Sequence, residues 1–564
     1  MAALVVPGVS VEARFDVLPP APAASGVVGV AAIVDHAPAT ARLVGVTKAA
    51  EVADVLGPGT AVSAPEIMHA LGNGAAEVVV APVLGGSPAR ATLTNQQSNP
   101  AVRLQTRSNG AWGNQLAVDV RTVNASDGSP VRATIRILRA GRVAEEFADL
   151  VVDPGSALDL YEVLNTRSAF VVALDPSFGD SSPAPNTYDL SDAEGAPVPV
   201  QGGVETLFTL LPRRGVDPEG LSARIDVPSK NKIRVRVFRN GALVEDFTDL
   251  TMNPDSRANL ASVLLRDSAT VHLRQAHSLA GAERLPAATI GPVPFTEGTS
   301  PNVAAYQGAI DLLAGDPRIN LVLAAVEPTT SASDVQAIHQ ALAAHAVAQS
   351  DAGAPRIAFG AVTADEQDDL DAVRDHSAAV RGRRFVLVSP AGAAGAVVGA
   401  VARLSPEVSP TFKPVPLFGV PPAGYRESEL NRLLGPTHNV AVVQQRTGRG
   451  VILLRGLDTS GDQISVTRVA DAAIREVKAI SENFIGILNT SDARAALREQ
   501  IIATFTRMER AGQLVPSTDG TDPAFLVDVY STQLDFAQGI VRIDIAVRPV
   551  RSIDYIYATI RVKN

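Results

Sequence analysis

The chain has 564 residues, of which 46% are apolar, 19% charged and 4% aromatic, and its formal net charge is −10. The modest negative charge argues against a dedicated nucleic-acid binder, which shows a basic field. The absence of cysteine excludes disulfides, thiolate metal sites and a cysteine nucleophile. A chain of this length is too long for one hydrophobic core, and we expect roughly three to five domains.

The two ends of the chain alternate apolar and polar residues with a period of two, as a strand with one buried face does. The apolar positions are Val9, Val11, Ala13 and Phe15 at the start, and Ile556, Ala558, Ile560 and Val562 at the finish. Termini are usually frayed unless something holds them. Strand-like ends therefore favour assembly with neighbouring subunits over chemistry. We expect residues 1–20 to form an N-terminal arm that packs with C-terminal domains.

Two separated segments alternate strand and helix patterns. The first predicts strands at 27–34, 41–46 and 77–83, and helices at 47–56, with Thr47 as N-cap, and 65–71. The second predicts strands at 320–326, 356–362 and 385–389, and helices at 333–349 and 364–380. Such alternation is typical of a mostly parallel sheet covered on both faces. We expect one discontinuous α/β core over 21–95 and 300–414.

The segment between them contains an internal duplication, because residues 136–171 align without a gap with 236–271, at an offset of 100. Identical pairs include Arg139/Arg239, Gly141/Gly241, Glu145/Glu245, Phe147/Phe247 and Asp149/Asp249. Each copy predicts a hairpin, with its turn at Ala140-Gly141 or Asn240-Gly241, and a short helix after it. We expect two tandem β-rich modules, at 96–175 and 205–275.

From residue 415 the pattern changes to that of a separate α+β domain, which we expect over 415–564. It predicts a hairpin at 439–444 and 450–455, helices at 469–480 and 492–511, and closing strands at 524–530, 540–548 and 555–561. The predicted fold is therefore a multidomain α/β and α+β protein. Its α/β core is interrupted by two β-rich modules, and extended strand arms lie at both termini.

Residues with catalytic or metal-binding potential are few and scattered. Phosphate-binding loops, nucleophile elbows and His-Glu-x-x-His motifs are missing from the sequence. His339 and His345 are six residues apart on one helix, hence on different faces, and we expect surface or half-buried positions for them and for His272 and His277. We expect a solvated helix N-terminus for the acidic group Asp365, Glu366, Asp368, Asp369 and Asp371, and a core position for Trp112. No enzyme activity, cofactor or metal is expected.

Several segments together resemble contractile tail sheath proteins, the outer-sheath subunits of contractile phage tails and related injection systems. These segments are PGVSVE (7–12), GVVGVAAIV (26–34), LGNGAAEVVVAPV (71–83), SNGAWGNQLAVDV (108–120), SPAGAAGAVVGAVAR (389–403) and GIVRIDIAVRPVRSIDYIYATIRV (539–562). Their order along the whole chain carries the resemblance. The duplicated modules are additional to the minimal sheath.

The resemblance implies a helical homopolymer of stacked rings around an inner tube, which contracts to drive the tube through a target envelope. Its implied partners are the tube protein and the baseplate and terminator or cap proteins, without nucleic acid or membrane insertion, after assembly in the cytoplasm. The terminal arms would add strands to neighbouring C-terminal domains. The helix at 492–511 is the candidate tube-facing surface or a merely solvated face, with Arg494, Arg498, Glu499, Arg507 and Arg510.

Two alternatives remain from the residues alone. A carbohydrate-binding or adhesin-like protein would show aromatic platforms on the tandem modules, whose aromatic residues lie mostly at core-like positions. An α/β enzyme would need polar groups that converge at the carboxyl ends of the core strands. Only Glu327, Thr363 and Ser389 occupy such positions, which we consider too sparse for an active site.

Overall fold

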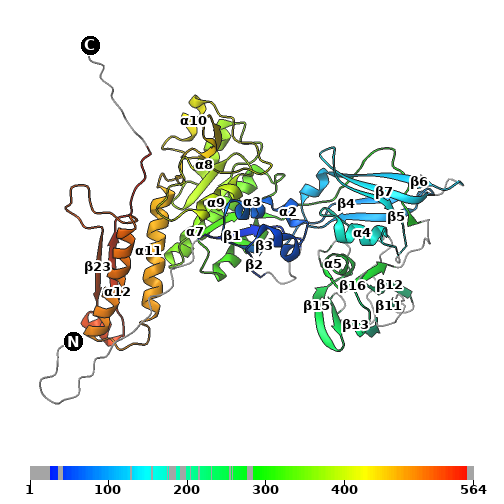
Figure 1. Cartoon of the computed structure of the whole chain (residues 1–564), viewed down its shortest axis with the longest axis horizontal. Coiled ribbons are helices and arrows are strands. Elements are labelled where there is room, and N and C mark those ends of the chain that lie inside the picture. The colour runs from blue at the N-terminus through cyan, green and yellow to red at the C-terminus, as the bar shows by residue number, and fades with distance from the viewer. Residues whose placement is uncertain are drawn as a thin grey trace, which may run out of the picture.

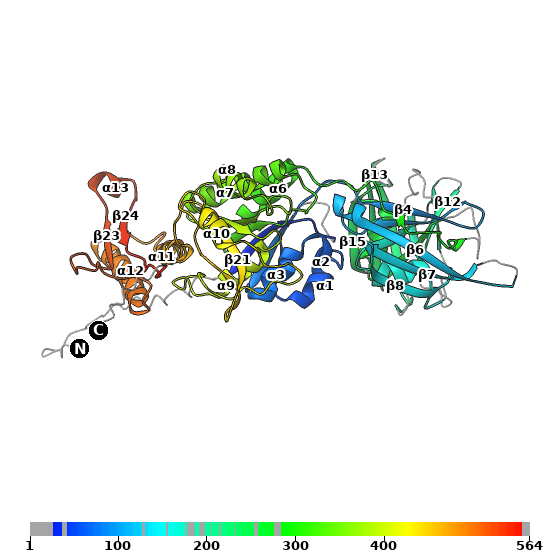
Figure 2. The same ribbon diagram turned by 90° about the horizontal axis from the view of Figure 1, so that it is seen from above.

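The computed structural model describes residues 26–35, 42–126, 130–153, 156–174, 176, 186–190, 198–202, 205–213, 216–229, 232–252, 256, 258–275 and 284–554. The described chain is elongated, with a C-terminal domain, an α/β core and a β-rich insertion following one another along its length (Figures 1 and 2). The expected N-terminal arm and the expected strand at 555–561 lie outside the described residues.

The core is built on an eight-stranded sheet with strand order β2-β3-β1-β18-β19-β20-β21-β22. These strands are β1 (Val27–Ala32), β2 (Val44–Val46), β3 (Glu77–Pro82), β18 (Leu321–Ala324), β19 (Ile357–Ala361), β20 (Phe385–Ser389), β21 (Ala441–Arg446) and β22 (Gly450–Leu453). The six inner strands run parallel, and only β2 and β22, at the edges, pair antiparallel. The prediction of a mostly parallel sheet is confirmed.

Helices cover both faces of this sheet because alternate residues of its strands point to opposite sides. Val28 and Val30 belong to one buried cluster, and Val27 and Ala31 to the other. The first face carries α1 (Val52–Leu56), α3 (Pro65–Asn73) and α9 (Ala394–Arg403), and the short helix α2 (Thr60–Ser63) lies against α1 and α3. The second carries α6 (Val303–Leu312), α7 (Ala332–Asp351), α8 (Leu370–Ala379) and α10 (Glu427–Leu433).

Helices α3 and α9 lie in close backbone contact. A Cβ atom at Gly395 or Gly399 of α9 would collide with the carbonyl of Glu66 or Ala70 on α3. Glycine is therefore required on this face of α9 at both positions, one helical turn apart. The run of small residues at 391–402 is explained by this packing.

Two details of the core differ from the sequence predictions. The expected domain boundary at residue 415 is wrong, because β21 and β22 extend the core sheet, with Val388 of β20 opposite Ala441 of β21. The expected N-cap at Thr47 is also wrong. A 3-10 turn, Ala49–Glu51, precedes α1, and the Thr47 hydroxyl donates instead to the Glu51 carboxylate, at 3.1 Å.

The insertion consists of two similar modules, each with two sheets and a helix. Module 1 has sheets β4-β5-β9 and β17-β6-β7-β8, and module 2 has sheets β11-β12-β16 and β10-β13-β14-β15. The module 1 elements are β4 (Arg90–Thr94), β5 (Pro100–Thr106), η2 (Ala111–Gln115), β6 (Leu116–Asn124), β7 (Pro130–Arg139), β8 (Arg142–Leu150), α4 (Leu160–Arg167), β9 (Val171–Leu174) and β17 (Val293–Pro294). The module 2 elements are β10 (Asn186–Asp189), β11 (Val198–Gly202), β12 (Glu205–Pro212), β13 (Leu221–Ser229), β14 (Lys232–Arg239), β15 (Ala242–Leu250), α5 (Leu260–Asp267) and β16 (Val271–Gln275).

Both predicted hairpins are present, with Arg139 opposite Arg142 in module 1 and Arg239 opposite Ala242 in module 2. Their two-residue turns have positive φ throughout, 48° at Ala140 and 49° at Asn240, as the right-handed twist of the strands favours. The module limits are wider than expected. Module 1 already includes β4 and also β17, which follows module 2 in sequence, and module 2 already includes β10.

The duplicated glutamates, Glu145 and Glu245, accept equivalent hydrogen bonds in the two modules. Glu145 accepts hydrogen bonds from the Ser168 hydroxyl, at 2.6 Å, and the Ala169 N–H, at 2.7 Å. Glu245 accepts from the Ser268 hydroxyl and the Ala269 N–H, both at 2.7 Å. Each glutamate thus connects the outer strand of a hairpin to the chain that leaves the module helix.

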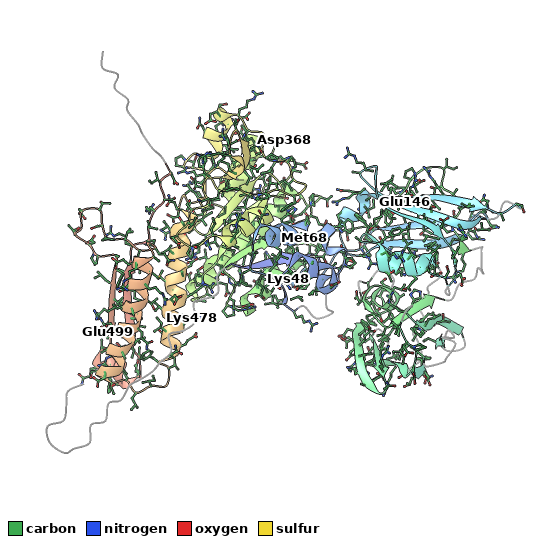
Figure 3. The ribbon with its side chains drawn as sticks, viewed as in Figure 1. Lys48, Met68, Glu146, Asp368, Lys478 and Glu499 are labelled. Atoms are coloured by element: carbon green, nitrogen blue, oxygen red, sulfur yellow. The ribbon has the colours of Figure 1, made fainter. Side chains whose placement is uncertain are left out.

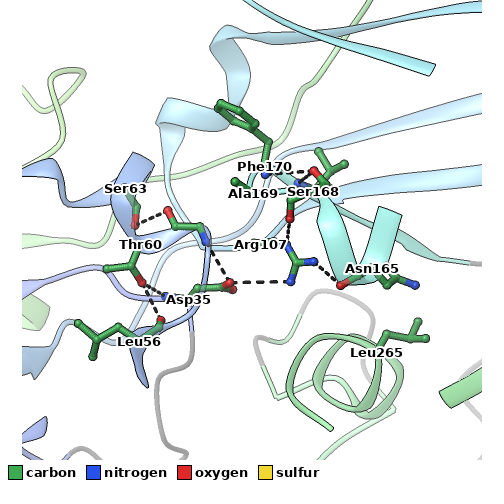
Figure 4. A network of polar contacts seen from close by, with 12 residues as sticks. Asp35, Leu56, Thr60, Ser63, Arg107, Asn165, Ser168, Ala169, Phe170 and Leu265 are labelled. Carbon is green, nitrogen blue, oxygen red and sulfur yellow. Dashed lines mark hydrogen bonds and ion pairs between the residues drawn. The ribbon is translucent and has the colours of Figure 1, made fainter. Parts of the chain in front are cut away.

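A buried arginine connects each module to the unit before it, and Figure 4 shows the arginine of module 1, Arg107. Arg107 donates to the Ser168 carbonyl, at 2.6 Å, and to that of Asn165, and its Nη1 lies 3.9 Å from Asp35 Oδ2 in the core. Arg213 donates in the same way to the Ser268 carbonyl, at 2.6 Å, and its Nη1 lies 3.6 Å from Glu162 of module 1. Each arginine thus contacts a carboxylate of the preceding unit and backbone carbonyls at the end of the helix of its own module.

Helix α11 (Ile464–Glu482) joins the core to the C-terminal domain. Its core-facing side is polar: Arg468 donates to the Leu404 carbonyl, at 2.8 Å, and Arg475 to that of Ile319, at 2.6 Å. Asp471 pairs with Arg384, at 2.8 Å. Its opposite side contributes Val469, Ala473 and Ile480 to the hydrophobic cluster of the C-terminal domain.

Candidate assembly interface

The C-terminal domain has a small sheet covered on one face by a helix. After α11 it comprises α12 (Ser491–Arg510), β23 (Phe525–Tyr530), α13 (Gln533–Ala537) and β24 (Arg542–Val547). Phe525, Val527, Ile543 and Ile545 pack with Leu497, Ile501, Phe505 and Met508 of α12 in one cluster. A single helix thus supplies most of the cover that the two strands obtain (Figure 1).

This sheet contains only β23 and β24 within the described ranges, paired antiparallel with Val527 opposite Ile545. Each strand therefore keeps one edge that no described strand occupies. Unpaired strand edges are templates for another chain, and an isolated two-stranded sheet is only marginally stable. The geometry of this sheet suits the addition of strands on either side.

The C-terminal domain also exposes large apolar side chains on its outer surface. Leu526 lies on the solvent face of β23, and 61% of its surface is exposed. Ile485 and Leu488, in the connection from α11 to α12, are 81% and 80% exposed, and Leu534 and Phe536 of α13 are 70% and 58% exposed. The hydrogen bond from Asn489 to Ser531, at 3.3 Å, brings that connection close to α13. Clustered exposure of this kind marks interaction surfaces in soluble proteins.

The five residues predicted to face a tube all lie on α12, but several are held by their own domain. Arg494 donates to the Asn489 side chain, at 2.6 Å, and Arg498 to the Val527 carbonyl, at 3.2 Å. Arg507 lies 3.3 Å from Glu476 of α11. Glu499, 3.5 Å from Arg498, and Arg510 are exposed, and Figure 3 shows Glu499 beyond Lys478 of α11 as seen from the core.

The residues predicted for the terminal arms are outside the described part of the chain. They are Val9, Val11, Ala13, Phe15, Ile556, Ala558, Ile560 and Val562. The sequence analysis missed the exposed apolar residues of the C-terminal domain. A signal for them exists in the chain, since Phe525, Leu526 and Val527 are consecutive apolar residues, so one of them must lie on the outer face of a strand.

Several titratable residues occupy more buried positions than expected. His339 and His345 are only 2% and 7% exposed. Each has a polar partner inside the core: His339 contacts His376, at 2.9 Å, and His345 contacts Arg356, at 2.8 Å. His272 is also buried, 3.3 Å from Glu162, and His277 lies outside the described residues. Glu366 is buried rather than solvated, while Asp369 caps α8 as an acid at a helix N-terminus does. Trp112 is buried in the module 1 core, as predicted.

Two further properties of the described residues bear on other kinds of site. No helix among them is long and apolar enough to cross a membrane. Within the same residues, no group of three or more histidine, aspartate or glutamate side chains is arranged to hold a metal ion.

Comparison with known proteins identifies the C-terminal part of the chain. Residues 458–563 match the family model of the phage tail sheath C-terminal domain, whereas no protein of curated function matches the chain. This range begins just before α11 and includes every element of the C-terminal domain described above.

Solved structures with some similarity include two bacterial sheath tail proteins. The one from Listeria innocua has a TM-score of 0.45 and 13% identity, over 94% of this chain and 92% of its own. The one from Desulfitobacterium hafniense has a TM-score of 0.43 and 14% identity, over 97% of both chains. The contracted helical sheath of the anti-feeding prophage has a TM-score of 0.37 and 18% identity, over 48% of this chain and 78% of its own. The similarity to known proteins therefore rests on residues 458–563, which match the phage tail sheath C-terminal domain.

Proposed function

We propose that the chain is the structural subunit of a contractile sheath, which polymerises helically around an inner tube and contracts to drive that tube through a target envelope. The observation that carries this proposal is the C-terminal domain. It matches the sheath family over residues 458–563, and its sheet has two strands, each with an edge that no described strand occupies.

Assembly proceeds by strand addition at these edges. The N-terminal arm of one copy and the C-terminal arm of another pair with β23 and β24 of a third copy, so that main-chain hydrogen bonds supply affinity. An arm of about fifteen residues spans roughly 50 Å at 3.3 Å per residue, enough to reach a neighbour. Such head-to-tail contacts generate an open helix rather than a closed dimer.

Contraction is a rigid-body rearrangement of subunits that stay linked through their arms. Support comes from the joints inside each subunit, since the Arg107–Asp35 and Arg384–Asp471 pairs hold the insertion and α11 firmly to the core. The movement then takes place between copies. No nucleotide is required, because the extended polymer stores the free energy at assembly.

We infer the remaining partners from the resemblance to sheath proteins and from the exposed surfaces of the C-terminal domain. The exposed part of α12, with Glu499 and Arg510, faces the inner tube. At either end of the polymer one set of strand edges has no neighbour, so the baseplate and the terminator or cap proteins cover those edges. Assembly takes place in the cytoplasm, and the product is part of a phage tail or a tail-like particle.

Deletion of residues 1–15 tests this proposal. We expect a chain with unchanged circular dichroism that no longer forms hollow cylinders in negative-stain electron microscopy. Two double substitutions test whether the apolar face of the arm is needed, without shortening the chain. Val9→Asp with Val11→Asp should prevent polymerisation, whereas Ser10→Ala with Glu12→Ala, on the other face of the strand, should not. Normal cylinders from the deletion variant would disprove the role of the arm.

A further inference from the structure

A cavity of about 400 Å³ lies between the core and module 1. It is lined by residues that follow β18, β19 and β20, by the start of α3, and by Trp112 of η2. In open parallel sheets, ligands bind outside the carboxyl ends of the strands, where the strand order reverses. Here the order reverses between β1 and β18, next to this cavity. Its size falls within the roughly 300–1,000 Å³ of small-molecule sites.

A buried chain of polar side chains leads to this cavity through His339. The Glu366 carboxylate accepts the Thr363 N–H, at 2.9 Å, and contacts Nδ1 of His376, also at 2.9 Å. In the neutral form of the His376 ring, that carboxylate keeps the proton on Nδ1, so Nε2 of His376 is an acceptor. It lies 2.9 Å from Nδ1 of His339, which therefore carries the proton of that ring. Nε2 of His339 is left as a hydrogen-bond acceptor.

His339 lines the cavity and stays neutral, since burial lowers its pKa to about 3, with His376 as a second cause. The acceptor at Nε2 is therefore retained at physiological pH.

Two glutamates add further acceptors to the cavity lining. Glu327 is 2% exposed, and one of its carboxylate oxygens accepts the Trp112 N–H, at 3.1 Å. No hydrogen bond of normal geometry reaches the other oxygen, and the nearby Ser300 hydroxyl only partly offsets the effect of burial on this carboxylate. Glu66 lies in the first turn of α3. Burial raises the pKa of Glu66 to about 7 and also raises the pKa of Glu327, and no cationic side chain opposes this effect at either carboxylate.

Two other titratable residues, His69 and Arg139, belong to the lining. His69 lies one turn beyond Glu66 on α3, and burial lowers its pKa, so it is neutral. Arg139, at the end of β7, is exposed. The rest of the lining is largely apolar and includes Val62, Val326, Val335, Val362 and Val420.

We propose that this cavity binds a primary ammonium group, carried either by a small aliphatic diamine or by a lysine side chain of another polypeptide. An ammonium has three donors and no acceptor, and the lining offers it acceptors on Glu66, Glu327 and His339. The valine side chains accommodate the methylene chain. A bound ammonium donates to the buried Glu327 carboxylate and offsets the cost of burying its charge.

Isothermal titration calorimetry of the full chain with putrescine and with Nα-acetyl-lysine amide tests the proposal. Butanediol, which has the length of putrescine but no charge, is the control ligand and should not bind. Glu327→Gln keeps an oxygen for the Trp112 N–H and removes the charge. We expect it and Glu66→Gln to weaken amine binding about tenfold or more each. Glu427→Gln, on the exposed start of α10, should leave the affinity unchanged.

Tighter binding of putrescine assigns the site to a free amine, and tighter binding of the lysine amide assigns it to a lysine side chain. Three results would overturn the proposal: neither amine binds, butanediol binds as well as putrescine, or both glutamine variants keep the wild-type affinity. Thermal melting of each variant verifies its fold. If Glu327→Gln fails to fold, Glu66→Gln and the comparison of amine with diol still decide the question.

Discussion

The α/β core and the C-terminal domain differ in how they cover the apolar faces of their sheets. The core covers both faces of its sheet with helices and ends it in short antiparallel strands, β2 and β22. The C-terminal domain covers one face of a two-stranded sheet and leaves Leu526 of the other face 61% exposed. Within a single chain, both faces of the core sheet are thus covered. The C-terminal domain has the features of a structure that neighbouring copies complete.

This comparison predicts that substitutions in the core side of the molecule reduce stability, whereas substitutions on the C-terminal surface reduce assembly. The contact between Arg107 and Asp35, which joins module 1 to the core, should affect stability because both charged groups are buried. Asp35 is 0% exposed and Arg107 4%. Buried pairs of this kind contribute little when intact but are costly to break from one side.

The largest effect is therefore expected from Arg107→Met, which leaves Asp35 buried without its guanidinium and releases the carbonyls at the end of α4. We expect a loss of about 3–5 kcal/mol in the free energy of unfolding of the core and module 1, measured by chemical denaturation. Arg318→Met is the control, because Arg318 is 53% exposed in its ion pairs and surface pairs contribute about 1 kcal/mol or less. Equal effects of the two variants would contradict a structural role for the joint.

The next effect concerns assembly rather than stability. Leu526→Asp should leave the melting temperature close to that of the wild type, since the side chain is exposed. If neighbours cover this face, the loss of about 1.5–3 kcal/mol of leucine burial raises the critical concentration for polymerisation about tenfold or more. Sedimentation of the polymer measures it. Asp528→Ser, on the same exposed face, is the control. An unchanged critical concentration for Leu526→Asp would show that this face stays in solvent.

Sequence patterns predicted the regular parts of this molecule well. The parallel strands of the core follow from continuous apolar runs, and the paired hairpins follow from the duplication and from the turns at Ala140-Gly141 and Asn240-Gly241. In each case the local pattern and the final packing agree. The prediction of α12 succeeded for the same reason.

The failures share one physical cause, which is that the deciding contact is distant in sequence. The hairpin of β21 and β22 was assigned to the C-terminal domain, because a local pattern cannot say which sheet a strand joins. The burial of His339 depends on His376 of the next helix. The convergence of Glu66 and Glu327 on one cavity depends on segments far apart in the chain.

The smallest effect we predict is a pH dependence confined to the C-terminal domain. The Arg542 guanidinium, 2.8 Å away, and the Thr532 hydroxyl lower the pKa of Asp535 to about 2 from its usual 3.8. A carboxylate with a lowered pKa in the folded state stabilises that state above its ordinary pKa, and this contribution is lost as the pH falls through the folded value. The C-terminal transition should therefore weaken between about pH 4 and pH 2 through this group.

Asp535→Asn should remove that part of the pH dependence, as followed by thermal melting, and Asp528→Asn should not. The effect is small, because Arg542 is 53% exposed and water screens the pair. Asp535 and Thr532 nevertheless fix the turn that presents Leu534 and Phe536. Polymerisation at neutral pH should therefore be more sensitive to Asp535→Asn than the melting temperature is. A variant that melts earlier but assembles normally would show that this turn lies outside the contacts between copies.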